Sequence, residues 1–422
     1  MQRRIVLLVF LILVAFLLWK TSDKNAGLEP SDRTGRRATD TEDLSAAETA
    51  EGHASLPTKA TQRKPASAKA THGPQRLKEF FLPVIEINGL TLQAALQKLK
   101  AAYEDACRET GETPLQLTFN VPAGKDKALR LKLASRNLEA SIRMLAAASG
   151  LTVKREGSAY HFEEPAALAG MSKKSFRVPP DLEAKLRESG GDLSNSGEFR
   201  DLFEAMGLDL DASTTISFDA KTGTVQLGTE SAADMTAVAG ITDLVSNDMP
   251  IQQKMETKIF ELPTGMEWNP PDPAAHYSDA QIQLMMREIA QINGIDLMTA
   301  PSVTARNGEA AKIEIIRELI TPTDDSGENF ETHNLGHVFD LQGSALGFGQ
   351  RMNVNYTDTV GGADPVTGKA QISTHTDIKN TSYVGDGSTK LYVQTRPDGT
   401  RTVLMVTPTM IDATGRPLRE QP

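Results

Sequence analysis

Two histidines, His333 and His337, are the residues of this chain whose type and spacing come nearest to a chemical site. Residues four apart share one face of a helix, so two imidazoles placed this way could bind a metal ion or serve a hydrolase. The intervening Asn334-Leu335-Gly336 disfavours a helix, and no carboxylate partner is evident in the sequence around them. We therefore expect exposed loop histidines, with a metal site or a hydrolytic centre as the alternatives.

Two further candidates for chemistry are weaker. Asp324, Asp325 and Glu328 offer the oxygen ligands that calcium takes, although we favour a solvated loop for them. Cys107 is the only cysteine, which excludes an intrachain disulfide and a zinc site built from cysteines. Its position in an apolar, helix-like stretch favours a buried structural thiol over a reactive one.

Motifs for nucleotide or metal-dependent catalysis are absent from the sequence. It contains no phosphate-binding loop, no dinucleotide fingerprint and no His-Glu-x-x-His. Gly343, Gly347 and Gly349 do not have the spacing of a phosphate cradle, and we expect them to permit strand bends or close packing. The sequence thus predicts no catalytic residues, no cofactor and no metal site, and an envelope enzyme is kept only as an alternative.

Length and charge narrow the class of protein. A chain of 422 residues is too long for one ordinary domain and indicates two or three. The net charge of -10 argues against a general nucleic-acid-binding protein, because such proteins carry a basic surface. We therefore expect no nucleic acid among the partners.

The first residues predict export. Arg3 and Arg4 precede an apolar run over residues 5–19 that Lys20 closes, and no Ala-x-Ala cleavage site follows. Residues 1–20 are therefore expected to be an uncleaved transmembrane signal anchor, with a cleaved signal peptide as the alternative. Residues 21–78 are polar, with almost no large apolar side chains, and are expected to form a disordered linker. The remainder of the chain would then lie in the periplasm.

Hydrophobic periodicity divides that remainder into three units and predicts an α+β fold. Residues 79–165 read as strand-helix-strand-strand-helix-strand-strand, with Thr91 capping the first helix. Residues 173–248 read as strand-helix-strand-strand-helix. Residues 250–416 are rich in alternating strands and contain one helix, which Ser278 and Gln281 cap.

Two motifs in the last unit resemble the bacterial secretin family. Residues 298–321 read MTAPSVTARNGEAAKIEIIRELIT, similar to the secretin run TP-S-x-x-x-x-N-x-E-A-x-I between a helix and a strand. Residues 401–412 read RTVLMVTPTMID and are similar to the closing secretin strand, including its proline at Pro408. Residues 79–165 in turn resemble the short N-terminal domain of secretins and TonB-dependent receptors, through INGLTL and LEASIRMLAAASGLTV. Residues 173–248 resemble the ring-building αβ repeats of the same family.

The resemblance implies a cell-envelope protein of type II or type III secretion, or of type IV pili, and not an enzyme. It implies a homo-oligomeric ring or channel component for protein transport. Its partners would be further copies of itself, other secretion-system components, an exported protein and the membrane. Strands near 310–316, 350–360, 370–380 and 401–410 would supply the ring wall, and association with the outer membrane would follow.

Three departures from the secretin pattern keep a second hypothesis open. Only residues 263–277 stand where secretins carry a long gate hairpin, and residues 385–400 are polar where secretins carry an apolar lip. The expected anchor would also hold the protein in the inner membrane. The alternative is a membrane-tethered periplasmic binding or signalling module that kept the fold and lost the pore.

Overall fold

The computed structural model describes part of the chain, and all described residues belong to one compact unit. The described residues are 74–419, except 125–126, 135, 191–197, 248–249, 267, 269–271, 273, 293–294, 296 and 324–327. The expected signal anchor over residues 1–20 and the linker as far as residue 73 lie outside them. Within the described residues, no helix combines the length and the apolar character needed to cross a membrane.

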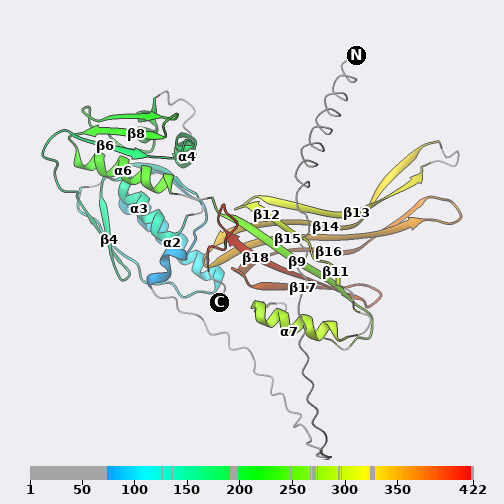
Figure 1. The fold of residues 1–422 in the computed structure, drawn as a ribbon. Helices are drawn as coiled ribbons and strands as arrows, with labels where there is room; N and C mark the ends of the chain where they lie inside the picture. The colour runs from blue at the N-terminus through cyan, green and yellow to red at the C-terminus, as the bar shows by residue number, and fades with distance from the viewer. Residues whose placement is uncertain are drawn as a thin grey trace, which may run out of the picture. The chain divides into compact units, whose positions relative to one another are not determined.

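The first αβ unit has the predicted order of elements (Figure 1). A short 3-10 helix precedes it, and its elements are η1 (Pro74–Glu79), β1 (Ile85–Leu90), α2 (Leu92–Thr110), β2 (Thr118–Asn120), β3 (Leu129–Leu133), α3 (Leu138–Ala148), β4 (Thr152–Glu156) and β5 (Ala159–Glu163). The expected linker boundary at residue 78 falls inside η1, whose Leu77 is fully buried. The folded region therefore starts earlier than the polar composition indicated.

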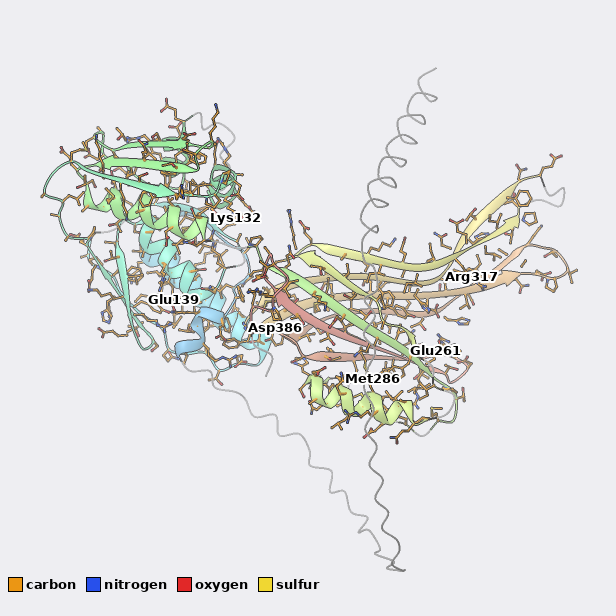
Figure 2. The ribbon with its side chains drawn as sticks, in the orientation of Figure 1. Lys132, Glu139, Glu261, Met286, Arg317 and Asp386 are labelled. Atoms are coloured by element: carbon orange, nitrogen blue, oxygen red, sulfur yellow. The ribbon has the colours of Figure 1, made fainter. Side chains whose placement is uncertain are left out.

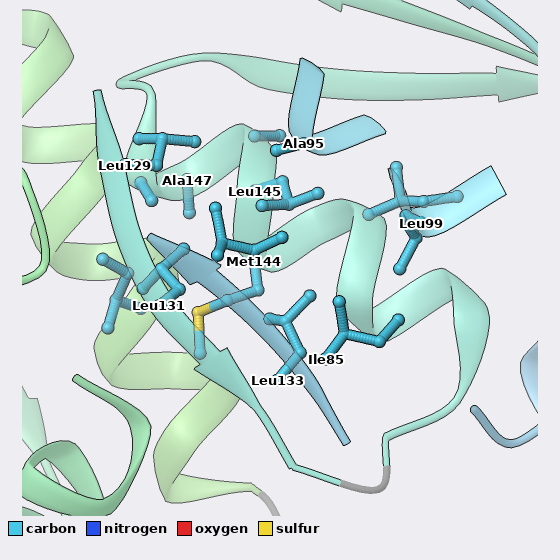
Figure 3. Close-up of a cluster of buried hydrophobic side chains, with 14 of the residues drawn as sticks. Ile85, Ala95, Leu99, Leu129, Leu131, Leu133, Met144, Leu145 and Ala147 are labelled. Atoms are coloured by element: carbon cyan, nitrogen blue, oxygen red, sulfur yellow. The ribbon is translucent and has the colours of Figure 1, made fainter. Parts of the chain in front are cut away.

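Local signals explain where the helices of this unit begin and end. The Thr91 hydroxyl oxygen accepts a hydrogen bond from the Ala94 N–H at 3.3 Å, as predicted, and Gly111 ends α2 in the left-handed conformation at φ 76°. The apolar faces of the helices then pack on the strands. Figure 3 shows one cluster that includes Ile85, Leu131 and Leu145 from β1, β3 and α3.

The second αβ unit contains one helix more than predicted. Its elements are β6 (Ser172–Arg177), α4 (Leu182–Ser189), α5 (Phe199–Ala205), β7 (Thr215–Asp219), β8 (Thr224–Thr229) and α6 (Ala232–Ser246). The extra helix α4 follows Pro179-Pro180, and its Leu182 and Leu186 are fully buried. Only two core residues mark its apolar face, which explains why periodicity alone did not reveal it.

The two αβ units pack together as one body, which we call the αβ pair (residues 74–247). Their buried side chains form a single hydrophobic cluster. Helices α3 and α6 approach so closely that a Cβ added at Gly240 would lie 2.9 Å from the Ala147 Cβ, and one at Gly150 would lie 2.9 Å from the Ala233 Cβ. Small residues at these crossings allow the close packing.

The rest of the described chain, residues 250–419, is the β unit. Its elements are β9 (Gln252–Leu262), β10 (His276–Tyr277), α7 (Asp279–Ala290), β11 (Leu297–Thr299), β12 (Ser302–Arg306), β13 (Ala310–Pro322), β14 (Phe330–Leu346), β15 (Gly349–Ala363), β16 (Ala370–Gly385), β17 (Thr389–Thr395) and β18 (Arg401–Ile411). Strands β13 to β16 form a four-stranded antiparallel sheet in chain order. The others form a six-stranded sheet in the order β10-β17-β18-β9-β11, with β12 also paired to β9.

The β unit has three layers, in which the six-stranded sheet lies between α7 and the four-stranded sheet. Alternation along β18 produces this arrangement, since Leu404 and Val406 pack toward the four-stranded sheet while Val403 and Met405 pack toward α7. Figure 1 shows α7 alongside the six-stranded sheet. The cap predicted for α7 is present, because the Ser278 N–H donates to the Gln281 side chain at 2.9 Å.

One prediction about the wall strands was wrong, and one strand was missed. Residues 401–410 do not join strands near 310–316, 350–360 and 370–380, because β18 pairs with β9 and β17 in the other sheet. The fourth strand is β14, which the sequence reading did not identify. The register also shifts between Asp358 and Thr359, so that Ile372 is 41% exposed whereas Thr376 is buried against the six-stranded sheet.

Pro408 is tolerated in β18 because the pairing of β18 with β17 has already ended at this position. Its carbonyl oxygen accepts from the Gly387 N–H at 2.9 Å, beyond the residues that β17 pairs. Because the nitrogen and the carbonyl of one strand residue point to the same side, the missing N–H removes no bond with β9.

Candidate functional site

The resemblance motif around Asn307-Gly308 forms the turn that carries the chain from the six-stranded sheet into the four-stranded sheet. The Asn307 side-chain oxygen accepts from the Gln253 side-chain amide at 2.8 Å and from the Ala345 N–H at 2.7 Å. The Gly308 N–H donates to the Gly343 carbonyl at 2.7 Å, and Gly308 has a φ of 83° that favours glycine. The motif therefore sets how the two sheets meet.

Gly343 allows the two sheets to come this close. A Cβ at this position would lie 1.9 Å from the Gln253 Oε1 and 2.8 Å from the Gln350 Oε1. Both glutamines are fully buried. The expectation that Gly343 permits close packing is therefore confirmed.

A second corner returns the chain from β16 to the six-stranded sheet. The Asp386 carboxylate accepts from the Met410 N–H at 2.7 Å and so ties this corner to β18. Burial raises the pKa of Asp386 above its usual value, although the Met410 N–H and Arg419 oppose the shift. Residues 385–400 are the polar segment that stands where secretins carry an apolar lip. They form this corner, strand β17 and the turn before β18.

A buried ionic group joins the sheets away from these corners, toward the other end of β9 (Figure 2). The Arg396 guanidinium donates to the Asp358 carboxylate at 3.2 Å and also contacts Glu261, while its Nε donates to the Thr376 hydroxyl at 3.2 Å. The side chains of Arg396 and Asp358 are only 8% and 4% exposed. Figure 2 marks Glu261 in the β unit. No local sequence pattern predicts that these residues come together, because they lie in segments far apart in the chain.

The two histidines lie in strand β14 and not in a loop, so that interpretation was wrong. Both are partly buried, with side-chain exposures of 20% for His333 and 16% for His337. The His337 Nδ1 lies 3.3 Å from the Asp358 carboxylate and 3.0 Å from the Tyr356 hydroxyl. His337 thus joins the sheet-joining ionic group, while His333 lies beside Glu331 at 3.7 Å.

The remaining candidate residues from the sequence, the acidic residues and Cys107, do not form a reactive site in the described part of the chain. Asp324 and Asp325 lie outside the described residues. Among the residues that are described, no three His, Cys, Asp or Glu side chains are grouped as a metal site would need. Cys107 is fully buried, as expected, and burial raises the pKa of its thiol to about 11. A thiol with that pKa is protonated at neutral pH and is a poor nucleophile.

Each outer strand of the four-stranded sheet has one edge that is not paired with another strand. In the described part of the chain, β13 pairs only with β14 and β16 pairs only with β15, over 13 and 15 residue pairs. Ile315, Ile316 and Ile320 on β13 are 41%, 38% and 59% exposed. Arg317, marked in Figure 2, lies on the same edge strand. Long edges of this kind, with exposed isoleucines, are templates for another strand.

A groove runs beside the β16 edge. It has a volume of about 570 Å³ and is lined by residues 377–382 of β16 and 390–394 of β17, together with Ala274. The Gln394 side chain accepts from the Asp377 N–H at 3.1 Å, which shows that this backbone donor faces away from β15 and into the groove. Alternation along the strand directs the backbone groups of Lys379 and Thr381 to the same side.

Comparison with known proteins yields structural matches only. No family model and no curated protein matches the chain. The structural matches include the type II secretion secretin XcpQ of Pseudomonas aeruginosa, with 13% identity, a TM-score of 0.33, and coverage of 78% of this chain and 92% of that one. The type IV competence pilus secretin PilQ of V. cholerae matches with 12% identity, a TM-score of 0.27, and coverage of 78% and 99%.

A third match is the type II secretin GspD from enteropathogenic Escherichia coli, with 8% identity and a TM-score of 0.27, covering 58% of this chain and 89% of that one. All three structures are secretins, the family whose motifs the sequence resembles. TM-scores this low carry no argument about function, which must come from the open strand edges of the chain itself.

Proposed function

We propose that this chain is a secretin-like envelope protein whose copies join edge to edge into a closed ring. The observation that carries the proposal is the pair of long open edges on the four-stranded sheet, β13 on one side and β16 on the other. Proteins that remain monomeric blunt such edges with short strands, charged side chains, prolines or bulges. Both edges are long, and the charges on β13 are of both signs, while β16 has its bulge near one end only. In β13 the only proline is Pro322, its last residue.

The directions of the two edges fit ring closure. Three antiparallel pairings separate β13 from β16, so the two strands run in opposite directions. A neighbour's β13 placed beside β16 would therefore continue the antiparallel order. Because the contact joins two different edges, it can repeat from copy to copy, and a rotation that closes the series gives a ring in which no edge stays open.

The motif resemblance supplies the setting of the proposed ring. It supports a role in the bacterial cell envelope, and we propose protein secretion or pilus-type export, with a structural and not a catalytic role. An N-terminal anchor would tether it, with the bulk in the periplasm. Its partners would then be other secretion-system components, an exported protein and the membrane.

A second candidate is a membrane-tethered periplasmic binding or signalling module without a pore. The placement of β17 favours it, because residues 389–395 are built into the six-stranded sheet, in the part of the sequence where secretins carry an apolar lip. The same β unit could then associate without providing a channel through the outer membrane.

Electron microscopy and conductance separate these functions. Negative-stain images of the full chain in detergent should show rings, and a chain that stays monomeric at every concentration would contradict the ring. Conductance across planar bilayers then distinguishes the two candidates. Rings that conduct support the channel component, whereas rings without conductance support the binding or signalling module.

A further inference from the structure

The turn between β14 and β15 belongs to the core of a different part of the chain. Leu346 and Phe348 in this turn are 3% and 7% exposed, and both pack in the hydrophobic cluster of the αβ pair. The core between the two sheets of the β unit does not include them. The tip of a β-unit hairpin thus completes the core of the αβ pair.

Backbone hydrogen bonds fix this turn to the segment before β1. The Phe81 N–H donates to the Gly347 carbonyl at 2.9 Å, and the Gly347 N–H donates to the Phe81 carbonyl at 2.8 Å. Gly347 has a φ of 57°, and a Cβ there would lie 2.8 Å from the Thr110 side chain at the end of α2. Only glycine meets both demands without strain, which gives a physical reason for Gly347.

The Phe348 ring is held on several sides. It meets the Phe80 ring edge to face, with centroids 5.2 Å apart. The Arg76 guanidinium lies 4.2 Å and the Arg419 guanidinium 5.3 Å from the ring centroid. Arg419 also donates to the Phe348 carbonyl and to the Glu79 carbonyl, so this one side chain near the C-terminus bridges both parts.

A charged pair extends the contact along β15. The Arg351 Nε donates to the Glu109 carboxylate at 2.6 Å, and a second guanidinium nitrogen contacts the other carboxylate oxygen. Both side chains are more than a third exposed, so water weakens the pair. Its value lies in orientation, because the forked guanidinium fits a carboxylate in one geometry.

We propose that the β14–β15 turn, the Arg351–Glu109 pair and Arg419 form an intramolecular latch that couples the αβ pair to the two middle strands of the four-stranded sheet. With the latch closed, a load on the αβ pair reaches β14 and β15, while the edges β13 and β16 stay free. With the latch open, only residues 247–251, between α6 and β9, join the two parts. The C-terminal tail controls this state, because Arg419 contacts both sides of the joint.

Single-molecule FRET on the full chain in detergent tests the latch, with donor and acceptor dyes at Lys221→Cys and Leu284→Cys. Labelled copies are diluted into an excess of unlabelled chain, so that energy transfer occurs within one copy. Cys107 is buried and takes up no dye. The otherwise unchanged chain should give one narrow distance population. Arg419→Ala should raise the open, broad population at least tenfold, and Phe348→Ala should do the same. Arg416→Ala, in the same tail but exposed, is the matched control and should change nothing.

A charge exchange distinguishes opening of the latch from misfolding of the variant. Glu109→Arg should open the latch, and adding Arg351→Glu should close it again, a rescue that general destabilisation does not give. A distribution that stays narrow in Arg419→Ala and Phe348→Ala overturns the proposal, as does a broad distribution without any substitution. The latch holds in a single copy, so its failure and a failure of ring assembly are separate results.

Discussion

The αβ pair and the β unit use strands in opposite ways. The αβ pair has strands of 3 to 6 residues, and its helices bury them in one shared core. The four-stranded sheet has strands of 13 to 17 residues, and both of its outer strands are unpaired in the described chain. Short edges are a small liability, whereas edges of this length are costly unless another strand covers them.

The difference teaches where each part obtains its stability. The αβ pair closes on itself through apolar packing. The β unit stacks two sheets through apolar side chains together with buried polar groups, and it leaves a pairing surface for another copy. Substitutions in the two sheets should therefore separate assembly from folding, and the expected effects below run from the largest to the smallest.

Charging the β13 edge should abolish assembly. Ile315→Lys with Ile316→Lys adds cations to an edge strand, a device that natural sheets use against pairing. Both positions are partly exposed in the single chain, so its stability should change by only ~0.5 kcal/mol. Rings should disappear in sedimentation velocity, with a loss of association of at least tenfold. Leu284→Lys on α7, which is 59% exposed, is the control and should assemble normally.

Removing the cation between the sheets should cost the most stability. Arg396→Met leaves the buried Asp358 carboxylate with only the His337 contact, and breaking a buried pair in this way costs ~3–4 kcal/mol. Urea denaturation measures the change. Lys379→Met removes a cation from an exposed pair and should change stability by less than ~0.5 kcal/mol. Equal effects of the two variants would mean that the Arg396 group does not hold the sheets together.

A side chain at Gly343 should separate the sheets at the motif turn. Gly343→Val places methyl groups where the buried Gln253 amide lies, and overpacking of this kind costs ~2–3 kcal/mol. Gly362→Val in β15 is the matched control, since nothing lies within 4 Å of a Cβ there. Denaturation midpoints should fall for the first variant and hold for the second. A stable Gly343→Val variant would show that the turn tolerates a wider gap.

Asp386 should give the smallest effect, and one that depends on pH. Burial raises its pKa in the folded chain, so its protonated form is favoured by folding. Its contribution is fully present below the unfolded pKa of ~3.9 and is lost as pH rises through the raised folded pKa. Asp386→Asn keeps an acceptor for the Met410 N–H and does not titrate. Its stability relative to the unsubstituted chain should therefore rise between pH 4 and neutrality, and a constant difference would contradict the burial of this carboxyl.

Local patterns were enough to predict most elements. The Thr91 cap and the Ser278 and Gln281 capping box both depend on neighbours in sequence. The sequence therefore predicted the order of elements in the first αβ unit correctly. It also predicted that the motif turn leads into a strand.

The arrangement of the strands could not be predicted in the same way. Strand β14 escaped notice because Gly336 and the two histidines interrupt its alternating Leu335, Phe339 and Leu341. The assignment of β18 to the other sheet depends on pairing with β9, well over a hundred residues earlier in the chain. The contacts of Arg396 are equally distant, so no local spacing encodes them.

Cysteine cross-linking between the two edges tests the ring most directly. Glu314→Cys on β13 and Lys379→Cys on β16 lie on the same face of the sheet but three strand spacings apart in one copy, ~14 Å, too far for a disulfide. Asp377→Cys and Thr381→Cys extend the β16 series by one register step each way. The account predicts that oxidation gives a ladder of covalent multimers with a β13–β16 pair and no such ladder with either cysteine alone. The absence of a ladder at all three β16 positions would contradict it.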